Sequence, residues 1–180
     1  AITNAYARYG LFLPFCATFF VFSDYMRASV RMAALMSLKE FFVWTHDSIG
    51  VGEDGPTHEP VEQLSSLRAM PNLFVFRPAS GVENTLCWQK ALGLNAPSAF
   101  VLSRQGLGAT PEAAFGSVGN GAYLLKEGKN AQITLLASGS EVELCLKASD
   151  LLAKEGVVAN VVSAPCFELF ESQDKSYKSR

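Results

Sequence analysis

The sequence lacks the features that mark several protein classes. Its 15 basic and 17 acidic residues nearly balance, and it has no basic stripe of the kind that binds nucleic acid. The longest apolar stretch, residues 11–22, is broken by proline, cysteine and threonine and is too short to span a bilayer. No basic segment followed by an apolar one opens the chain, so we recognise no signal peptide. We expect a cytoplasmic protein with no nucleic-acid partner and no membrane partner.

Cysteine is scarce and scattered. The four cysteines form no C-x-x-C pair and stand far apart, at Cys16, Cys87, Cys145 and Cys166. This spacing predicts reduced thiols in a cytosol-like compartment, and neither a disulfide framework nor a zinc site. Apolar residues, in contrast, make up 49% of the chain, which is enough for a packed core.

Neither end of the sequence has the signals of a complete structural unit. Residues 1–10 carry apolar side chains at helical spacing without a capping residue before them, and residues 167–180 stop without closing a unit. We therefore expect the chain to be part of a longer protein. Address signals at the true termini would lie outside the sequence, so an organellar location stays open.

Strand-like and helix-like segments alternate along the first part of the chain. The strand patterns are residues 41–45, 72–78 and 98–104, and the helix patterns are residues 30–39, 59–70 and 81–94. Such alternation is typical of a parallel sheet. We predict an α/β fold in which helices cover both faces of a parallel sheet.

The composition changes at residues 105–121, where five glycines and a proline predict a linker. Strand patterns return after it, and Ser140 with Glu143 predicts a capping box at the start of a helix that Gly156 can end. We expect one nearly complete α/β domain over residues 1–118 and the first part of a second α/β domain over residues 119–180.

Two sets of polar side chains follow predicted strands, where open parallel sheets carry their ligand sites. His46 directly follows one strand, and His58 closes the glycine-rich loop that begins there. Arg104 follows another strand, where its planar guanidinium suits a phosphate group. Each also has an ordinary interpretation: the histidines as loop residues, Glu53 and Asp54 as a solvated acidic turn, and Arg104 as a surface arginine paired with a carboxylate.

A third set is aromatic. It recurs at roughly helical spacing and consists of Phe12, Phe15, Phe19, Phe22 and Tyr25. Such a stripe is more typical of a buried core helix than of a cofactor site. The number of rings also suits stacking against a flat heteroaromatic ring, so the residues alone leave both interpretations open.

The motif GEDGPTHEPVEQ, within residues 45–72, resembles the transketolase signature. VRMAALM (30–36) before it, and FRPASGVE (76–83), AFVLSRQGL (99–107) and SGSEVELCLKA (138–148) after it, fit the same family in the same order. The resemblance covers nearly the whole chain. Because the motif is long and continuous, the resemblance is specific.

The resemblance implies a thiamine-diphosphate-binding fold and a transferase of the pentose phosphate pathway. Transketolases are homodimers of three-domain chains with the active site between subunits. They move a two-carbon ketol unit from a ketose phosphate, such as xylulose 5-phosphate, to an aldose phosphate, such as ribose 5-phosphate. This chain resembles most of the second, pyrimidine-binding domain and the start of the C-terminal domain. The first domain, which binds the cofactor's diphosphate and a divalent metal (magnesium or calcium), lies outside it.

The resemblance also assigns roles to residues of this chain. Phe19, Phe22 and Tyr25 match the aromatic pocket for the cofactor's aminopyrimidine. His46 and Arg104 match contacts to the sugar phosphate, and Asp54 matches the carboxylate that reads a sugar hydroxyl. His58 matches a substrate-binding histidine near the donor's first hydroxyl, where it could also help proton transfer as a catalytic residue.

The sequence departs from the family where the cofactor is activated. The family's key glutamate belongs before Ala1, and no residue of this chain matches the metal ligands. We therefore expect the 180 residues alone not to catalyse ketol transfer. A dihydroxyacetone synthase, which uses formaldehyde as acceptor, would carry the same loop. If the chain is naturally this short, a non-catalytic protein built on the same domain is the alternative from a different class.

Overall fold

The computed structural model of the chain describes residues 1–110 and 117–179, which form two compact units. Unit 1 consists of residues 1–76 and 91–106, and unit 2 of residues 77–90 and of the chain from residue 107 onward. The predicted linker at 105–121 falls partly on residues 111–116, which lie outside the described residues. The domain boundary at residue 118 stays a prediction.

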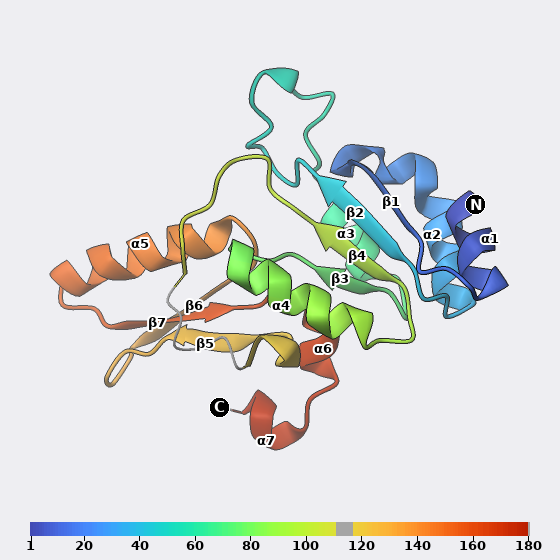
Figure 1. The fold of residues 1–180 in the computed structure, drawn as a ribbon. Helices are drawn as coiled ribbons and strands as arrows, with labels where there is room; N and C mark the ends of the chain where they lie inside the picture. Colours follow the sequence, from blue (N-terminus) through green and yellow to red (C-terminus); the bar gives the residue numbers. More distant parts are fainter. Residues whose placement is uncertain (111–116, 180) are drawn as a thin grey trace. The chain divides into compact units, whose positions relative to one another are not determined.

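Unit 1 is built on a four-stranded parallel sheet (Figure 1). In spatial order its strands are β1 (Phe15–Phe19), β2 (Phe41–Thr45), β4 (Ser98–Val101) and β3 (Phe74–Phe76). The three strands expected from apolar runs are confirmed. The sheet has a fourth strand, β1, inside the aromatic segment, where no strand was predicted.

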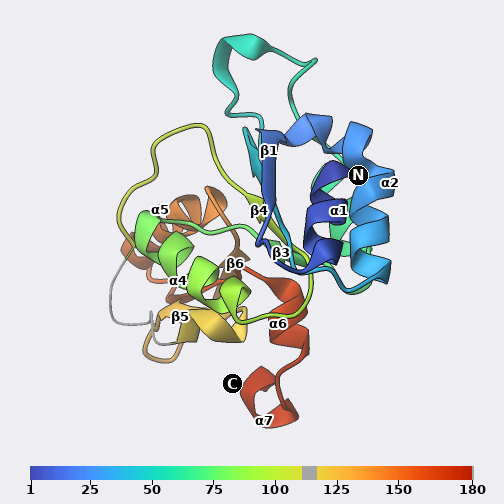
Figure 2. The same ribbon diagram turned by 45° about the vertical axis from the view of Figure 1, so that its right-hand side comes forward.

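Helices cover one face of this sheet. They are α1 (Ile2–Tyr9), α2 (Ser23–Leu35) and α3 (Gln63–Arg68). Figures 1 and 2 show α1 and α2 on the same side of the sheet. Val30 and Ala33 of α2 and Leu67 of α3 pack there in one buried cluster with Phe42 and Trp44 of β2. The alternation of side chains along a strand sends these two strand residues to the same face.

The opposite face of the sheet is buried as well. Phe41 is 3% exposed, and the rings of Phe76 and Phe100 stack with centroids 5.0 Å apart. Burial on both faces explains why these strands are continuous apolar runs without polar alternation. The predicted α/β fold with a covered parallel sheet is confirmed.

The helix boundaries differ from those predicted. The helix expected at 30–39 runs instead from Ser23 to Leu35, and Ser37 takes a positive φ of 51° just after it. The helix expected at 59–70 runs only from Gln63 to Arg68. Val61, within the range predicted for that helix, lies before its first turn and is 83% exposed. Periodicity locates a helix but leaves its ends uncertain.

Unit 2 is built on a mixed sheet with the strand order β5-β7-β6. Strand β6 (Ile133–Ala137) is parallel to β7 (Ala159–Ser163), and helix α5 (Glu141–Lys154) connects them along the chain. This β–α–β segment confirms the predicted second α/β unit. Strand β5 (Tyr123–Lys126) runs antiparallel to β7, which the sequence pattern did not reveal. The other helices are α4 (Gly81–Leu92), which ends in unit 1, α6 (Phe167–Glu171) and α7 (Lys175–Lys178).

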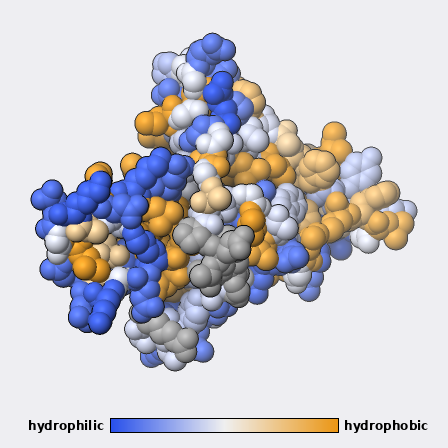
Figure 3. Space-filling view, turned by 60° about the vertical axis from the view of Figure 1, so that its left-hand side comes forward, coloured by the Kyte–Doolittle hydropathy of each residue, from blue (hydrophilic) through white to orange (hydrophobic). Residues whose placement is uncertain are grey.

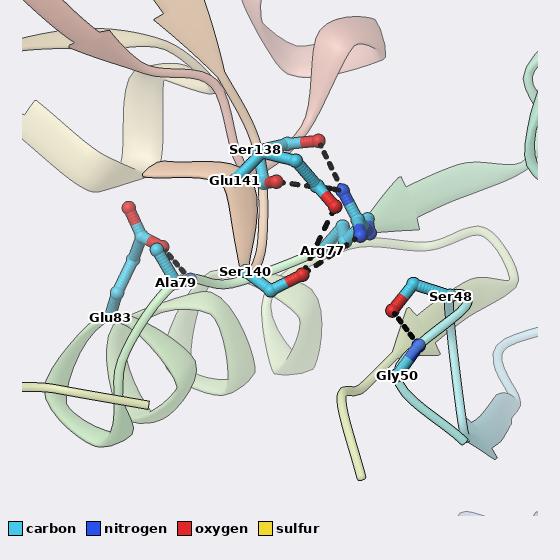
Figure 4. A network of polar contacts seen from close by, with 8 residues as sticks. All are labelled: Ser48, Gly50, Arg77, Ala79, Glu83, Ser138, Ser140 and Glu141. Atoms are coloured by element: carbon cyan, nitrogen blue, oxygen red, sulfur yellow. Dashed lines mark hydrogen bonds and ion pairs between the residues drawn. The ribbon is translucent and has the colours of Figure 1, made fainter. Parts of the chain in front are cut away.

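A buried carboxylate joins α4 to this sheet. Glu83 is fully buried and accepts hydrogen bonds from the Tyr123 hydroxyl at 2.7 Å and the Ser163 hydroxyl at 2.6 Å. It also accepts one from the backbone N–H of Ala79 (Figure 4). Burial and the Glu83 carboxylate raise the pKa of Tyr123, so its hydroxyl stays a donor. The carboxylate thereby fastens the start of α4 to β5 and β7.

The predicted capping box at α5 is wrong. Ser140 stands at the N-cap position, but its side chain makes no capping hydrogen bond. The polar groups around the start of α5 bind the buried Arg77 instead. Its guanidinium donates to the Ser138 carbonyl at 2.7 Å and forms an ion pair with Glu141 (Figure 4). Although burial raises the pKa of Glu141, the hydrogen bond and charge of Arg77 outweigh it and hold that pKa below its ordinary value.

No helix in the described part of the chain is long and apolar enough to cross a membrane.

Candidate functional site

The predicted site residues lie at the carboxyl edge of the sheet of unit 1. Phe19 at the end of β1 pairs with Thr45 at the end of β2, so the segments that follow these strands start side by side. The segment after β1 is a short 3₁₀ helix, Phe20–Phe22, that leads into α2. The segment after β2 is the glycine-rich loop, which projects at the top of Figure 1 and again at the top of Figure 3, where much of its surface is hydrophilic.

His46 begins this loop in an unusual backbone conformation. Its φ is +62°, a value that non-glycine residues seldom adopt. The conformation accompanies a stack of the imidazole on the ring of Phe19, with centroids 3.7 Å apart and an interplanar angle of 24°. The ring nitrogen Nδ1 lies 3.0 Å from the Thr45 hydroxyl, and Nε2 lies 4.0 Å from a carboxylate oxygen of Asp54. The loop thus folds back so that Asp54 faces His46.

His58 approaches the same aromatic residues from the other end of the loop. Its ring lies edge-on to Phe22 at 5.3 Å and to Phe19 at 6.1 Å. Its Nδ1 lies 2.8 Å from the Thr57 hydroxyl, and its backbone N–H donates to the Gly55 carbonyl at 3.0 Å. Both histidines of the chain therefore meet at Phe19, one stacked on its ring and one steeply inclined to it.

Three aromatic rings extend from these histidines in a row. Phe19 and Phe22 stack with centroids 6.3 Å apart, and Phe22 and Tyr25 lie 6.0 Å apart. The first two are half-buried, whereas Tyr25 is 88% exposed. We call this row, Phe19, Phe22 and Tyr25, the aromatic wall. The exposed part of its aromatic surface suits contact with a flat heteroaromatic ligand.

The other two aromatic residues of the predicted stripe lie apart from this wall. Phe12 packs against Tyr6 and Tyr9, and Phe15 is 68% exposed on β1. The interpretation of the stripe as a buried core helix is wrong, because the chain passes from strand to 3₁₀ helix to α-helix within it. The fully buried ring of this segment is that of Phe20, which was outside the stripe.

Arg104 reaches the loop from the end of β4. Its guanidinium lies so close to Gly52 that a Cβ at that glycine would stand 3.0 Å from Cζ. Gly52 also has a φ of +76°, so two independent constraints favour glycine there. The side chain of Arg104 is exposed, and its fork of donors is available to an anionic group beside the loop.

Gln105 is a residue of this site that the sequence reasoning missed. Its Oε1 would lie 2.7 Å from a Cβ at Gly50, so its amide fills the space that this glycine leaves. The backbone N–H of Gly50 donates to the Ser48 hydroxyl at 3.3 Å (Figure 4). The only signal in the sequence was its position next to Arg104.

The assembled site suits binding and proton transfer. Two imidazoles, a carboxylate and an arginine stand beside the aromatic wall, all within unit 1. Among the described residues no three His, Cys, Asp or Glu side chains gather as metal ligands would. The arrangement fits a flat aromatic ring next to a polar, anionic small molecule.

Comparison with known proteins points in one direction. A family model described as transketolase, pyrimidine binding domain, matches residues 1–110, and one described as transketolase-like TK C-terminal domain matches residues 121–180. A curated transketolase of Halalkalibacterium halodurans is 53% identical over 99% of this chain and 28% of its own length.

Solved structures agree with this. The crystal structure of transketolase from Campylobacter jejuni has a TM-score of 0.96 and 66% identity, over 99% of this chain and 28% of that one. A transketolase from Pichia stipitis, in complex with sedoheptulose 7-phosphate, has a TM-score of 0.88 and 39% identity, over 91% of this chain and 24% of that one. The chain spans less than a third of the length of these relatives.

Proposed function

The chain belongs to the transketolase family, and from this premise we propose that it supplies the pyrimidine-binding part of a thiamine-diphosphate-dependent ketol transferase. The proposed reaction moves a two-carbon ketol unit reversibly from a ketose phosphate to an aldose phosphate in the pentose phosphate pathway. The proposed domains are residues 1–118 and the start of a C-terminal domain over 119–180. The observation that carries the proposal is the meeting of both histidines at the aromatic wall beside Asp54 and Arg104.

The aromatic wall would hold the cofactor's aminopyrimidine. When bound, thiamine diphosphate supplies an electron sink for the breaking carbon–carbon bond. Phe22 is half-buried and Tyr25 is largely exposed, so both have aromatic surface that a ligand ring could contact. Phe19 would act mainly through His46, whose ring it supports. A magnesium or calcium ion, in this proposal, is held outside this chain.

The loop would bind the sugar. The Nε2 atom of His46 lies 4.0 Å from a carboxylate oxygen of Asp54, and both side chains are partly exposed, so both can form hydrogen bonds with hydroxyl groups of one substrate. His58 would stand near the donor's first hydroxyl, where its imidazole can take or return a proton. Arg104 would bind the phosphate through charge-assisted hydrogen bonds, which are the strong ones in such a site. The sedoheptulose 7-phosphate bound to the P. stipitis relative supports a sugar phosphate as substrate.

Replacing Arg104 tests this proposal in the whole enzyme that contains the chain. Arg104→Ala is expected to raise KM for phosphorylated sugars by about 10- to 100-fold, because a hydrogen bond to a charged group contributes about 1.5–3 kcal/mol. KM for unphosphorylated sugars should change little. Arg8→Ala is a suitable control, because Arg8 is exposed on α1 and is not among the candidate site residues. Equal effects on both kinds of sugar would remove Arg104 from the phosphate role.

We further propose that the whole enzyme is a cytoplasmic homodimer with its active site at the subunit interface. Membership of the family supports this assembly. The amount of thiamine diphosphate bound at protein concentrations below and above dimer dissociation would test it, since a monomer would lack half of each site.

A further inference from the structure

A charged groove lies between α2 and α3, and its lining residues are different from those of the candidate site. It is a surface hollow of about 570 Å³ within unit 1. Its lining includes Asp24, Arg27, Ala28 and Arg31 of α2, and Ser66 of α3. None of these residues belongs to the aromatic wall or to the glycine-rich loop. The volume falls in the range of small-molecule sites.

Helical spacing brings the charged residues of α2 into this one groove. Asp24, Arg27, Ala28 and Arg31 recur at intervals of three and four residues, so they share a face of the helix. Arg27 and Arg31 are one turn apart on this face, and the small side chain of Ala28 lies beside them in the lining of the groove.

A hydrogen-bond network holds the groove in shape. The buried Gln63 donates from Nε2 to the carboxylate of Asp24 at 2.9 Å. Arg27 donates to the hydroxyl of Ser66 at 2.7 Å, and that hydroxyl donates to the Gln63 carbonyl at 2.9 Å. Asp24, Arg27 and the start of α3 are thus fixed before any ligand arrives, which lowers the ordering cost of binding.

The charge of the groove favours an anion. Its lining contains two arginines and one aspartate, and the other lining residues are uncharged, so the net charge is positive. Like charges four residues apart on a helix repel each other and destabilise it. An oxyanion between Arg27 and Arg31 would relieve this repulsion, and guanidinium groups bind such oxygens in pairs.

We propose that the α2–α3 groove is a binding site for a phosphate group carried by a small molecule, separate from the proposed sugar-phosphate site. The phosphate lies between the guanidinium groups of Arg27 and Arg31. The rest of the molecule extends over Ala28 toward Ala69 and Met70 of the facing side. The site does not depend on the proposed enzymatic function, because it shares no residue with that site.

Titration of the isotope-labelled 180-residue chain with inorganic phosphate, at ionic strength held constant with chloride, tests the proposal by nuclear magnetic resonance. The expected result is a saturable shift of the backbone amide signals of residues 24–31 and 66–71. Arg27→Gln and Arg31→Gln should each weaken binding about threefold, and the double variant about tenfold, as for partly solvated charge pairs. Arg27→Lys, which keeps the charge but loses the fork, should bind with intermediate affinity.

Arg8→Gln serves as the matched control, because Arg8 is an exposed arginine of unit 1 that does not line the groove. It should leave the titration unchanged. Unchanged amide signals far from the groove verify that each variant is folded. Non-saturable shifts spread over the surface, or equal binding by the double variant, would overturn the proposal. Binding of a glutamate-rich peptide without binding of phosphate would also overturn it, since the groove would then serve a protein partner.

Discussion

Glu40 is a buried carboxyl group that the proposed function does not use. It precedes β2 and is 0% exposed, and neither carboxylate oxygen has a hydrogen-bond partner among the described residues. Burial raises its pKa from 4.5 to about 7. Cys16, on the adjacent strand, responds to the same surroundings, because burial raises its pKa and the Glu40 charge adds to that effect.

Glu40 should make the stability of the chain depend on pH. Below pH 4.5 the carboxyl is protonated in both the folded and the unfolded state. Between pH 4.5 and about 7 the unfolded state loses the proton first, so rising pH favours unfolding. Above that range the full cost of the buried charge, about 3 kcal/mol at most, is present.

Glu40→Gln should remove this dependence. Relative to the original chain, the variant is expected to gain stability steadily between pH 4.5 and 7.5, although the buried amide carries a constant cost of its own. Urea unfolding at several pH values measures the difference. Glu127→Gln, at an exposed position, is the control, and its free energy of unfolding should change with pH as that of the original chain does. If the free energy of unfolding of Glu40→Gln showed the same pH dependence, the Glu40 carboxyl would not be the group that titrates.

Phe22 allows a second test at the scale of one side chain. Phe22→Ala in the whole enzyme should weaken thiamine diphosphate binding about three- to tenfold, because it removes a stacked ring worth about 0.5–1.5 kcal/mol beyond its buried area. Equilibrium dialysis of the cofactor measures the change. Phe12→Ala is the matched control, since Phe12 is exposed and packs with Tyr6 and Tyr9 instead. Unchanged affinity in Phe22→Ala would leave the aromatic wall without a role in cofactor binding.

At the scale of elements, the glycine-rich loop packs against Arg104 at Gly52. Gly52→Ala should destabilise the chain by about 1 kcal/mol, because alanine resists a positive φ. Its methyl group would also push against the Arg104 guanidinium. In the whole enzyme we therefore expect a higher KM for phosphorylated sugars. Steady-state kinetics with phosphorylated and unphosphorylated donors measures this effect.

Gly55→Ala separates backbone strain from the contact with Arg104. Gly55 also has a positive φ, of 73°, but no heavy atom outside its chain neighbours would lie within 4 Å of a Cβ there. It should lower stability without a selective rise in KM for phosphorylated sugars. If KM for phosphorylated sugars rose equally in Gly52→Ala and Gly55→Ala, strain in the loop backbone alone would explain the kinetic effect.

The elements that could be predicted from the sequence are those with strong local signals. Strands β2, β3 and β4 are apolar because both faces of the sheet are buried, and the chain shows this directly. The ends of α2 and α3 could not be predicted, because the apolar pattern does not follow the hydrogen-bonded turns. Helix α2 begins ahead of its pattern, whereas the pattern of α3 extends past both ends of that helix. The absence of a cap at Ser140 could not be predicted either. The Ser140 hydroxyl accepts a hydrogen bond from Arg77, which is 63 residues away in the chain.

The same contrast holds for the site. His46, His58 and Arg104 could be placed at the carboxyl edge because they follow predicted strands or close the loop between predicted elements. That both histidines meet at Phe19 depends on the positive φ of His46 and on the strand β1, and neither leaves a pattern in the sequence. The amide of Gln105 occupies the space that Gly50 leaves by having no side chain, and this contact between distant residues leaves no pattern in the sequence.

At the scale of the whole molecule, the candidate site is open. The aromatic wall ends in Tyr25, which is 88% exposed, so a ring stacked on it would keep its other face in water. Catalysis of this kind depends on a site that excludes water and fixes the reacting groups. The chain spans 28% of the length of its curated relative from H. halodurans, and the other parts of the enzyme would supply the remaining walls.

We therefore predict that the 180-residue chain alone does not turn over sugar phosphates. The assay combines the purified chain with thiamine diphosphate, magnesium, xylulose 5-phosphate and ribose 5-phosphate, and follows the products by mass spectrometry. The intact mass of the sample, 19.4 kDa, verifies that the chain itself is assayed. The whole enzyme, assayed in parallel, should be active under the same conditions. Turnover by the chain alone would mean that the wall and the loop suffice for catalysis, and would contradict the division of labour proposed between this chain and the rest of the enzyme.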